Sequence, residues 1–294
     1  MRTKVLSVAL AAIALGTVTV APASAAEGNP VVEIVSAFDG TCAQLQVEAA
    51  PDWPRPVLRS CTEAPAQRWE QIPANGGKVI LRSTTSRDCL EAGASVNNFW
   101  CDDRSVYQQA ELVPDADGTV RIKYGSEYVE NQHSSLWMAR FADSDRQRWR
   151  VRQVGTTTPP ADTAGQVVRI EAVALGFGCL TVDDRSVPKP TPCADVAAQK
   201  FQRIELADGG TALRSLANGK CLHAEDGAEV VVDALAECDA LDAGQTWKLD
   251  RSVTGAFRVR SGERVLTPGD NNVWAAAEFP PTFMSVQIWH VTAA

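Results

Sequence analysis

The chain has 294 residues and a formal net charge of −8 at pH 7, with 36 acidic and 28 basic side chains. An acidic surface lacks the clustered Lys and Arg that a phosphate backbone requires, so we expect no nucleic-acid partner. The length is sufficient for two domains of about 125 residues each.

The first residues have the composition of a secretory signal peptide. Two basic residues precede an apolar run over 5–20, and Ala23-Ser24-Ala25 supplies a small-x-small cleavage pattern. We therefore expect a signal peptide at 1–25, cleaved near Ala25, and a secreted mature protein. A retained membrane anchor is the alternative, but this run is short and no later stretch is apolar enough to span a bilayer.

A short pattern, Gln-x-aromatic, closes six successive blocks of about forty residues. The first three glutamines lie 41 and 39 residues apart, the last three lie 46 and 42 apart, and 52 residues separate the two sets. This period corresponds to one supersecondary unit per repeat, and the spacing indicates two domains of three repeats each. The motifs are Gln67-Arg68-Trp69, Gln108-Gln109-Ala110 (aromatic lost), Gln147-Arg148-Trp149, Gln199-Lys200-Phe201, Gln245-Thr246-Trp247 and Gln287-Ile288-Trp289.

Within each repeat, short runs of alternating apolar and polar residues are separated by turn clusters. Residues 78–81 alternate in this way, and 75–77 and 115–118 are clusters rich in Gly, Asn or Asp. No segment sustains a helical period over three turns. Short, evenly spaced strands with frequent turns indicate an all-β fold. Threefold repetition favours four strands per repeat and a closed barrel with a hairpin cap, in each of two domains.

The eight cysteines fall in four sequential pairs, each inside one repeat. An even count in an exported chain favours disulfides, and matching placement in both halves favours local pairing. Closing each loop contributes about 3 kcal/mol in the chain-entropy description. A zinc site is the alternative, but no Cys-x-x-Cys pair is present, and no metal is expected. The expected disulfides are Cys42–Cys61, Cys89–Cys101, Cys179–Cys193 and Cys221–Cys238.

A Thr/Pro-rich stretch separates the two halves. Residues 155–165 contain Pro159-Pro160 among small polar residues, which predicts an extended linker. The first domain is expected over 26–154 and the second over 166–294. Corresponding blocks of the two halves share their spacing, which indicates an internal duplication.

The order of the motifs resembles the ricin B-type β-trefoil lectin family. Gly-x-Cys-Leu, as at 219–222, stands early in a repeat, a second Cys follows after a short strand, and Gln-x-Trp closes the repeat. The resemblance covers essentially the whole mature chain, twice over. It implies two tandem β-trefoil domains, no catalysis in the trefoils, no cofactor, and shallow sugar pockets, at most one per repeat.

Position within the repeat distinguishes the residues expected in the core from those expected to bind sugar. Four tryptophans recur at one phase of the repeat, three of them with an apolar residue two places on, so they are predicted to pack in the core. They are Trp69, Trp149, Trp247 and Trp289. In the family, an acid two residues after the first Cys and an aromatic before the second Cys grip the sugar, and Asn precedes the glutamine.

This chain departs from that family pattern. The acid position holds Gln44, Glu91, Glu130, Thr181, His223 and Thr267, and Asn before the glutamine is absent throughout. The second repeat keeps most elements, followed by the third and then the sixth. The alternative role for the aromatic residues is to fill the flank of the barrel. The expected carbohydrate-binding residues are Glu91, Asn97, Phe99, Trp100, Gln108, Glu130, Trp137, Asn272 and Trp274.

No catalytic constellation is evident. The acidic pairs Asp102-Asp103 and Asp183-Asp184 lie in turn-rich segments and are predicted to be solvated loops. The three histidines occur singly in different repeats, which suggests neither a triad nor a metal cluster. We therefore expect a non-catalytic protein that binds glycan or polysaccharide. The alternative is a trefoil without sugar binding that docks another secreted protein, such as an exported enzyme or toxin, or inhibits a protease.

Overall fold

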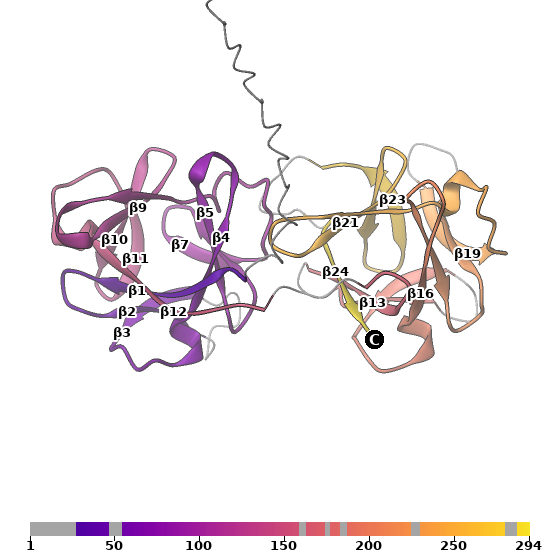
Figure 1. Ribbon diagram of the computed structural model, residues 1–294, viewed down its shortest axis with the longest axis horizontal. Coiled ribbons are helices and arrows are strands. Elements are labelled where there is room, and N and C mark those ends of the chain that lie inside the picture. The colour runs from indigo at the N-terminus through magenta and orange to yellow at the C-terminus, as the bar shows by residue number, and fades with distance from the viewer. Residues whose placement is uncertain are drawn as a thin grey trace, which may run out of the picture.

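The computed structural model describes residues 28–46, 55–158, 163–173, 177–182, 187–224, 230–279 and 287–294. Within these ranges the elements are β-strands and short 3-10 helices, arranged as two lobes that lie side by side (Figure 1). The expected signal peptide lies outside the described residues. The last strand of the first lobe runs through Thr156, so two residues of the expected linker are in a strand, and Pro159-Pro160 lies outside the described residues.

The first lobe contains β1 (Pro30–Ser36), β2 (Cys42–Gln46), β3 (Arg55–Arg59), η1 (Pro65–Gln67), β4 (Trp69–Pro73), η2 (Asn75–Gly77), β5 (Val79–Ser83), β6 (Cys89–Ala92), β7 (Val96–Phe99), β8 (Glu111–Pro114), η3 (Ala116–Gly118), β9 (Val120–Tyr124), β10 (Glu127–Gln132), β11 (Ser135–Ala139), η4 (Asp145–Gln147) and β12 (Trp149–Thr156). The second contains β13 (Val167–Ala172), β14 (Cys179–Val182), β15 (Pro188–Thr191), η5 (Ala197–Gln199), β16 (Phe201–Glu205), β17 (Thr211–Ser215), β18 (Cys221–Ala224), β19 (Val230–Ala236), η6 (Ala243–Gln245), β20 (Lys248–Arg251), β21 (Phe257–Ser261), β22 (Arg264–Pro268), β23 (Val273–Ala277) and β24 (Trp289–Ala293).

In the first lobe, antiparallel pairing closes a barrel. β1 pairs with β12 and β4, β4 with β5, β8 with β9, and β9 with β12. The bridge between Val79 and Ala110 joins β5 to the start of β8 and completes the ring. The hairpins β2–β3, β6–β7 and β10–β11 form the cap. Each repeat therefore contributes four strands, two of them to the barrel and two to the cap.

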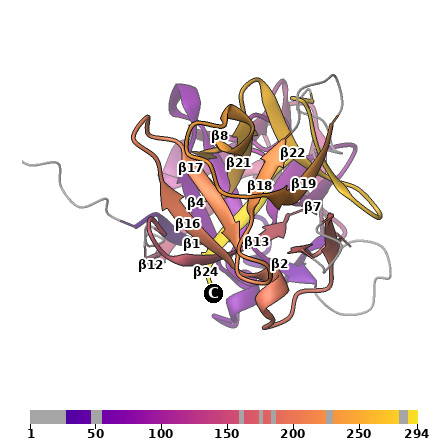
Figure 2. The ribbon, with the colours of Figure 1, turned by 90° about the vertical axis from the view of Figure 1, so that its right-hand side faces the viewer.

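The second lobe repeats this arrangement. Its ring runs through β13, β16, β17, β20, β21 and β24, and a bridge between Thr211 and Trp247 joins β17 to the β20 segment. In Figure 2 this lobe faces the viewer, with the first lobe behind it. Closure leaves the barrel strands without an open edge. The prediction of an all-β protein with two tandem β-trefoils is confirmed.

The motif tryptophans fill the barrels, as predicted. Trp69, Trp149, Trp247 and Trp289 are fully buried in the two main core clusters, and Ala110 and Phe201 occupy the same position in the other two repeats. Each indole N–H donates to the backbone carbonyl of the residue just before the acid position, over 2.9–3.0 Å. A buried indole thereby satisfies its one donor and fixes the strand that carries the acid position. Those carbonyls belong to Ala43, Val129, Leu222 and Leu266.

Four disulfides join the cysteines within single repeats, in the predicted pairing. Each closes a short loop, with the partners 12 to 19 residues apart in sequence. In each pair the first cysteine starts the first strand of the cap hairpin, at the foot of that hairpin. The disulfides therefore fix the hairpin of the first two repeats in each lobe, and the third repeats are built without them.

Ion pairs join the two lobes. Arg258 on β21 donates from Nη2 to Asp102 Oδ1 and Asp103 Oδ1, each at 2.8 Å, and Arg104 pairs with Glu278. Asp102 is only 2% exposed. The prediction that this acidic pair forms a solvated loop is therefore wrong for Asp102, because the second lobe covers it. The other acidic pair, at 183–184, lies outside the described residues.

Candidate functional site

The glutamine of each Gln-x-aromatic motif fastens the loop that precedes it. Its side-chain oxygen accepts a hydrogen bond from a loop N–H, and its amide donates to a loop carbonyl. All six glutamines are at most 2% exposed. An unpaired buried amide costs about 1–3 kcal/mol, so these bonds hold the loop in place. The N–H donors belong to Thr62, Asp102, Ala142, Ala194, Asp239 and Phe279.

The same amide also reaches the acid position in five of the six repeats. Its Nε2 donates to a side-chain oxygen on the first cap strand, over 2.8–3.0 Å. In the fifth repeat Gln245 instead donates to Asp242 Oδ2 at 3.2 Å, and His223 Nε2 lies 3.5 Å from the same carboxylate oxygen. The glutamine therefore orients whatever acceptor stands at this position, charged or neutral. The acceptors are Gln44, Glu91, Glu130, Thr181 and Thr267.

The residue opposite the acid position differs among the repeats. Directly opposed residues of an antiparallel pair project from the same face with their Cβ atoms about 5 Å apart. Trp137 lies opposite Glu130, and Trp274 lies opposite Thr267. The other four opposing residues are not aromatic: Val57, Asn97, Lys189 and Asp233. The third repeat of each lobe is therefore where an indole stands beside the acid position.

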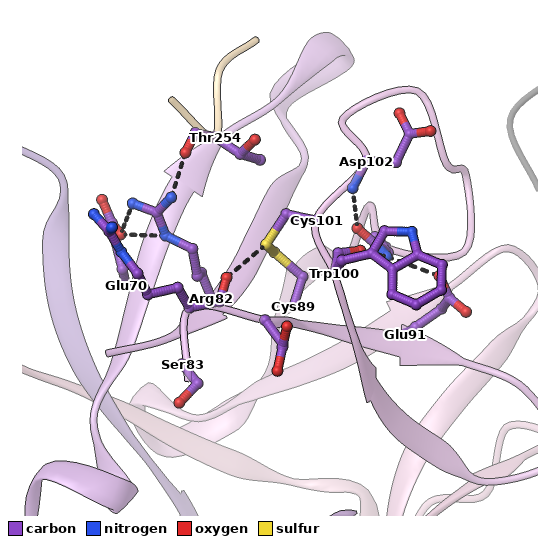
Figure 3. The surroundings of a disulfide bond; sticks show 12 residues. Glu70, Arg82, Ser83, Cys89, Glu91, Trp100, Cys101, Asp102 and Thr254 are labelled. Carbon is purple, nitrogen blue, oxygen red and sulfur yellow. Dashed lines mark hydrogen bonds and ion pairs between the residues drawn. A yellow bond between two sulfur atoms is a disulfide. The ribbon is translucent and has the colours of Figure 1, made fainter. Parts of the chain in front are cut away.

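In the second repeat the expected sugar ligands are buried. Glu91 is 3% exposed, Gln108 is 1% and Trp100 is 7%, so these side chains do not offer a surface to a glycan (Figure 3). The reason is the loop before Gln108, which folds over the strand: the carbonyl of Tyr107 accepts from the N–H of Ala92 at 2.8 Å. The expectation that the second repeat holds the best pocket is thus corrected for these three residues.

Burial has a large effect on the carboxyl of Glu91. It raises the pKa to about 7, the charge of Asp102 adds to the rise, and the hydrogen bond from Gln108 opposes it. Glu91 Oε1 has no hydrogen-bond partner among the residues that the structure describes. Asn97, opposite Glu91, is half-buried and bonds the carbonyl of Ser95. This pocket is closed.

Phe99 does not complete a sugar site either. It is half-buried, pairs across the hairpin with Cys89, and meets the ring of Trp100 edge-on, with 5.8 Å between the ring centroids. An edge-on aromatic pair is a packing arrangement. Trp100 is buried and Phe99 is half-buried against it, which favours the alternative role of filling the flank of the barrel.

The third repeat keeps an accessible pair. Trp137 on β11 is 41% exposed, and Glu130 on β10 is half-buried with Oε2 held by Gln147 at 2.9 Å. Here the residue before the glutamine, Arg146, does not fold its backbone over the strand. Its side chain donates to the carbonyl of Asn131 at 3.1 Å.

Two residues that the sequence analysis did not assign border this face. The guanidinium of Arg146 stacks on the ring of Phe38, 4.0 Å from its centroid. The turn that carries Phe38 is fastened to β10, because Asn131 Nδ2 donates to Ser36 and to Asp39. Arg146 could have been found from its place before Gln147. Phe38 belongs to another repeat, and no motif points to it.

The sixth repeat has the indole without the carboxylate. Thr267 is 1% exposed and uses its hydroxyl as the acceptor for Gln287. Trp274 is half-buried and covers Gly269, where a Cβ would lie 2.5 Å from the indole Cη2. Asn272 is half-buried, and its carbonyl accepts from the N–H of Gly269 at 2.9 Å. The backbone therefore occupies part of the indole surface that a sugar would need.

The described part of the chain contains β-strands and short 3-10 helices. No group of three or more His, Cys, Asp or Glu side chains there is arranged to hold a metal ion. Among the same residues, no helix has the length and apolar character needed to cross a membrane.

Known proteins are similar to this chain in structure only. No protein-family model matches the sequence, and no curated protein matches it significantly. Among solved structures, the designed threefold-symmetric protein ThreeFoil is 15% identical over 42% of this chain and 99% of its own, with a TM-score of 0.39. An agglutinin from Abrus precatorius is 17% identical over 92% of this chain and all of its own, with a TM-score of 0.35. A mosquitocidal holotoxin is 12% identical over 90% of this chain, with a TM-score of 0.40, and the match spans only 34% of the toxin.

Proposed function

We propose that this protein is a secreted carbohydrate-binding protein of the ricin B-type, without catalytic activity, and that its principal sugar site is the face of the β10–β11 hairpin. The observation that carries the proposal is the pairing of the exposed indole of Trp137 with the carboxylate of Glu130. An indole plane receives the apolar face of a pyranose ring, and an oriented carboxylate accepts from vicinal hydroxyls.

The surroundings support this assignment. Gln147 orients Glu130 at 2.9 Å, and Arg146 adds a donor beside it. Fixing the carboxylate before the ligand arrives lowers the entropy lost on binding. Trp274 provides a second, weaker contact in the other lobe, and the two lobes together would raise the avidity for a repeated glycan. The four disulfides are typical of an exported protein.

The test is a glycan array on the mature protein, followed by calorimetric titration of the best glycan. We expect Trp137→Ala to weaken binding at least about tenfold, because stacking and burial of the ring face are lost. Glu130→Gln should weaken it less, since the amide keeps an acceptor for the sugar. The matched control is Phe141→Ala, which removes an aromatic side chain 60% exposed on the same lobe. A blank array, or equal binding by Trp137→Ala, would exclude this site.

One observation favours a different function, that of a protein-interaction subunit. The loop that closes the second-repeat pocket presents Val106 and Tyr107 to solvent, at 61% and 48% exposure. Apolar side chains adjacent on an exposed loop are typical of a contact with another protein. In that case the array would be blank, and one exported protein would co-purify in a 1:1 ratio and be lost with Val106→Ser.

A further inference from the structure

The exposed indole of Trp137 has a neighbour from the second repeat. An antiparallel bridge pairs Trp137 with Ser95, which lies in the turn between β6 and β7. The β6–β7 and β10–β11 hairpins therefore lie side by side in the first lobe (Figure 1). Because directly opposed residues of an antiparallel pair project from one face, Ser95 shares the face of Trp137. It lies on the side of Trp137 away from Glu130.

Three residues thus lie abreast on the outer face of the cap: Glu130 on β10, Trp137 on β11 and Ser95 in the neighbouring turn. The residues beside them in sequence, such as Leu136 and Val96, are buried in the core cluster of the first lobe. Alternation along the strands therefore directs the three outward. Neighbouring strands are about 4.8 Å apart, so the row is about 10 Å wide. One pyranose ring does not cover that width.

Asn97 extends this row on the second repeat. It lies two places after Ser95, on the same face, and Ser95 Oγ is 3.5 Å from Asn97 Oδ1. Asn97 Nδ2 donates to the carbonyl of Ser95 at 3.1 Å, which fixes the orientation of the amide. Both residues are half-buried. A side-chain amide has two N–H donors and two lone pairs on its oxygen, so one donor and one lone pair remain for a ligand.

The equivalent place in the second lobe holds an apolar residue. Trp274 is paired on one side with Thr267 and on the other with Val231 from the fifth repeat. A valine side chain has no hydrogen-bonding group. The trefoil scaffold therefore accepts an apolar residue beside the indole, and a polar residue such as Ser95 is not a requirement of the cap.

The order of groups in the row matches two sugar units. When the hydroxyls on C3 and C4 of a pyranose bind a carboxylate, the edge formed by C1 and the ring oxygen is on the opposite side of the ring. With Glu130 on one side of the indole, that edge is directed toward Ser95. C1 carries the glycosidic bond, so the next sugar of the chain reaches Ser95 and Asn97. Both of these side chains are uncharged and suit a neutral sugar.

We propose that the Trp137 face is a site for a disaccharide or a longer neutral saccharide, in which Ser95 and Asn97 bind the second sugar. The inference rests on the proposed function, because Trp137 and Glu130 hold the first sugar. The site is then built jointly by the second and third repeats. Asn97 serves it in place of the pocket of its own repeat, which is closed at Glu91.

The experiment uses the full mature chain and matched probes, each a methyl glycoside and the disaccharide that extends it at C1. The pairs are methyl β-galactoside with lactose, methyl β-glucoside with cellobiose, and methyl β-N-acetylglucosaminide with diacetylchitobiose. In calorimetric titrations we expect the disaccharide of the pair that binds to be held about tenfold more tightly than its glycoside. Ser95→Ala and Asn97→Ala should each weaken the disaccharide about threefold, and leave the methyl glycoside unchanged.

A second measurement needs no substitution in the site. In NMR titrations, the side-chain amide resonances of Asn97 should shift with the disaccharide and not with the methyl glycoside, whereas the indole N–H of Trp137 should shift with both. The matched control is Gln132→Ala. Gln132 is a half-buried residue on the same outer face, two places from Glu130 toward the hairpin turn. Its removal should change neither affinity.

The outcomes separate this inference from the proposed function. If Trp137→Ala abolishes binding but the disaccharide binds no more tightly than its glycoside, the second-sugar site is excluded and the proposed function stands. The same holds if the variants of Ser95 and Asn97 keep the full gain. A gain lost with Gln132→Ala instead would place the second sugar along the hairpin and overturn the inference. If no probe binds and the array is blank, both proposals fail.

Discussion

The two lobes share a scaffold and differ at the position that faces the motif glutamine. In the first lobe this position holds Gln44, Glu91 and Glu130, and in the second it holds Thr181, His223 and Thr267. The glutamine amide donates to a threonine hydroxyl and to a carboxylate over the same range of 2.8–3.0 Å. The scaffold therefore requires only an acceptor. The fold does not need the negative charge of a carboxylate at this position. That charge can contribute to binding only where solvent or a ligand reaches it.

The third repeats of the two lobes make the difference plain. Both place an indole opposite the acceptor. In the first lobe the indole of Trp137 is exposed beside Glu130, whereas in the second Trp274 packs on Gly269 beside a buried Thr267. The third repeat of the first lobe therefore has an exposed indole beside a carboxylate. In the second lobe the indole at the same position packs against the backbone. The comparison predicts that, within the third repeats, substitutions at the Trp137 pair change sugar binding and substitutions at the Trp274 contact change stability.

The largest expected effect tests whether the two barrels are equivalent. Trp149→Ala and Trp289→Ala each remove a fully buried indole together with its N–H bond to a strand carbonyl. Each should lower the free energy of unfolding of its lobe by about 3–5 kcal/mol, measured by urea denaturation. Trp137→Ala is the surface control and should cost about 1 kcal/mol or less. If the two core variants behaved like the surface control, the packing role would be wrong.

The second prediction uses the buried carboxyl of Glu91 in the first lobe. The folded-state pKa of Glu91 is about 7, above its ordinary 4.5, so between these pH values the folded protein keeps a proton that the unfolded chain has released. Stability attributable to Glu91 is therefore full below pH 4.5 and is lost as the pH rises to 7. Relative to Glu91→Gln, the natural protein should lose on the order of 3 kcal/mol between pH 5 and pH 8.

The second lobe supplies the matched control for that titration. Thr267 occupies the acid position of the sixth repeat and does not titrate, so Thr267→Val should lower stability by about 1–2 kcal/mol through the lost acceptor for Gln287, equally at both pH values. A difference between Glu91→Gln and the natural protein that stays constant from pH 5 to pH 8 would mean that Glu91 is ionised in the folded state.

Features that recur within each repeat could be predicted from the sequence. Contacts that join different repeats could not. Periodicity predicted the core tryptophans and the local disulfides, and the family resemblance located the six acid positions, because each depends on a pattern inside one repeat. The burial of Glu91 could not be predicted from the repeat pattern, because it depends on the loop that carries Tyr107 folding back onto Ala92. Arg258 lies 156 residues from Asp102, and no sequence motif predicts that ion pair.

The smallest effect concerns the packed indole of the second lobe. The backbone of Gly269 does not have a positive φ, so its conformation is open to any residue. A side chain there is unfavourable only because its Cβ would lie 2.5 Å from the Trp274 ring. Gly269→Ala should displace the indole toward solvent and cost about 1–2 kcal/mol. The indole N–H resonance of Trp274 would then shift while that of Trp137 stays in place. If neither stability nor that resonance changed, Gly269 would not hold the indole down, and Trp274 would be as available to a sugar as Trp137.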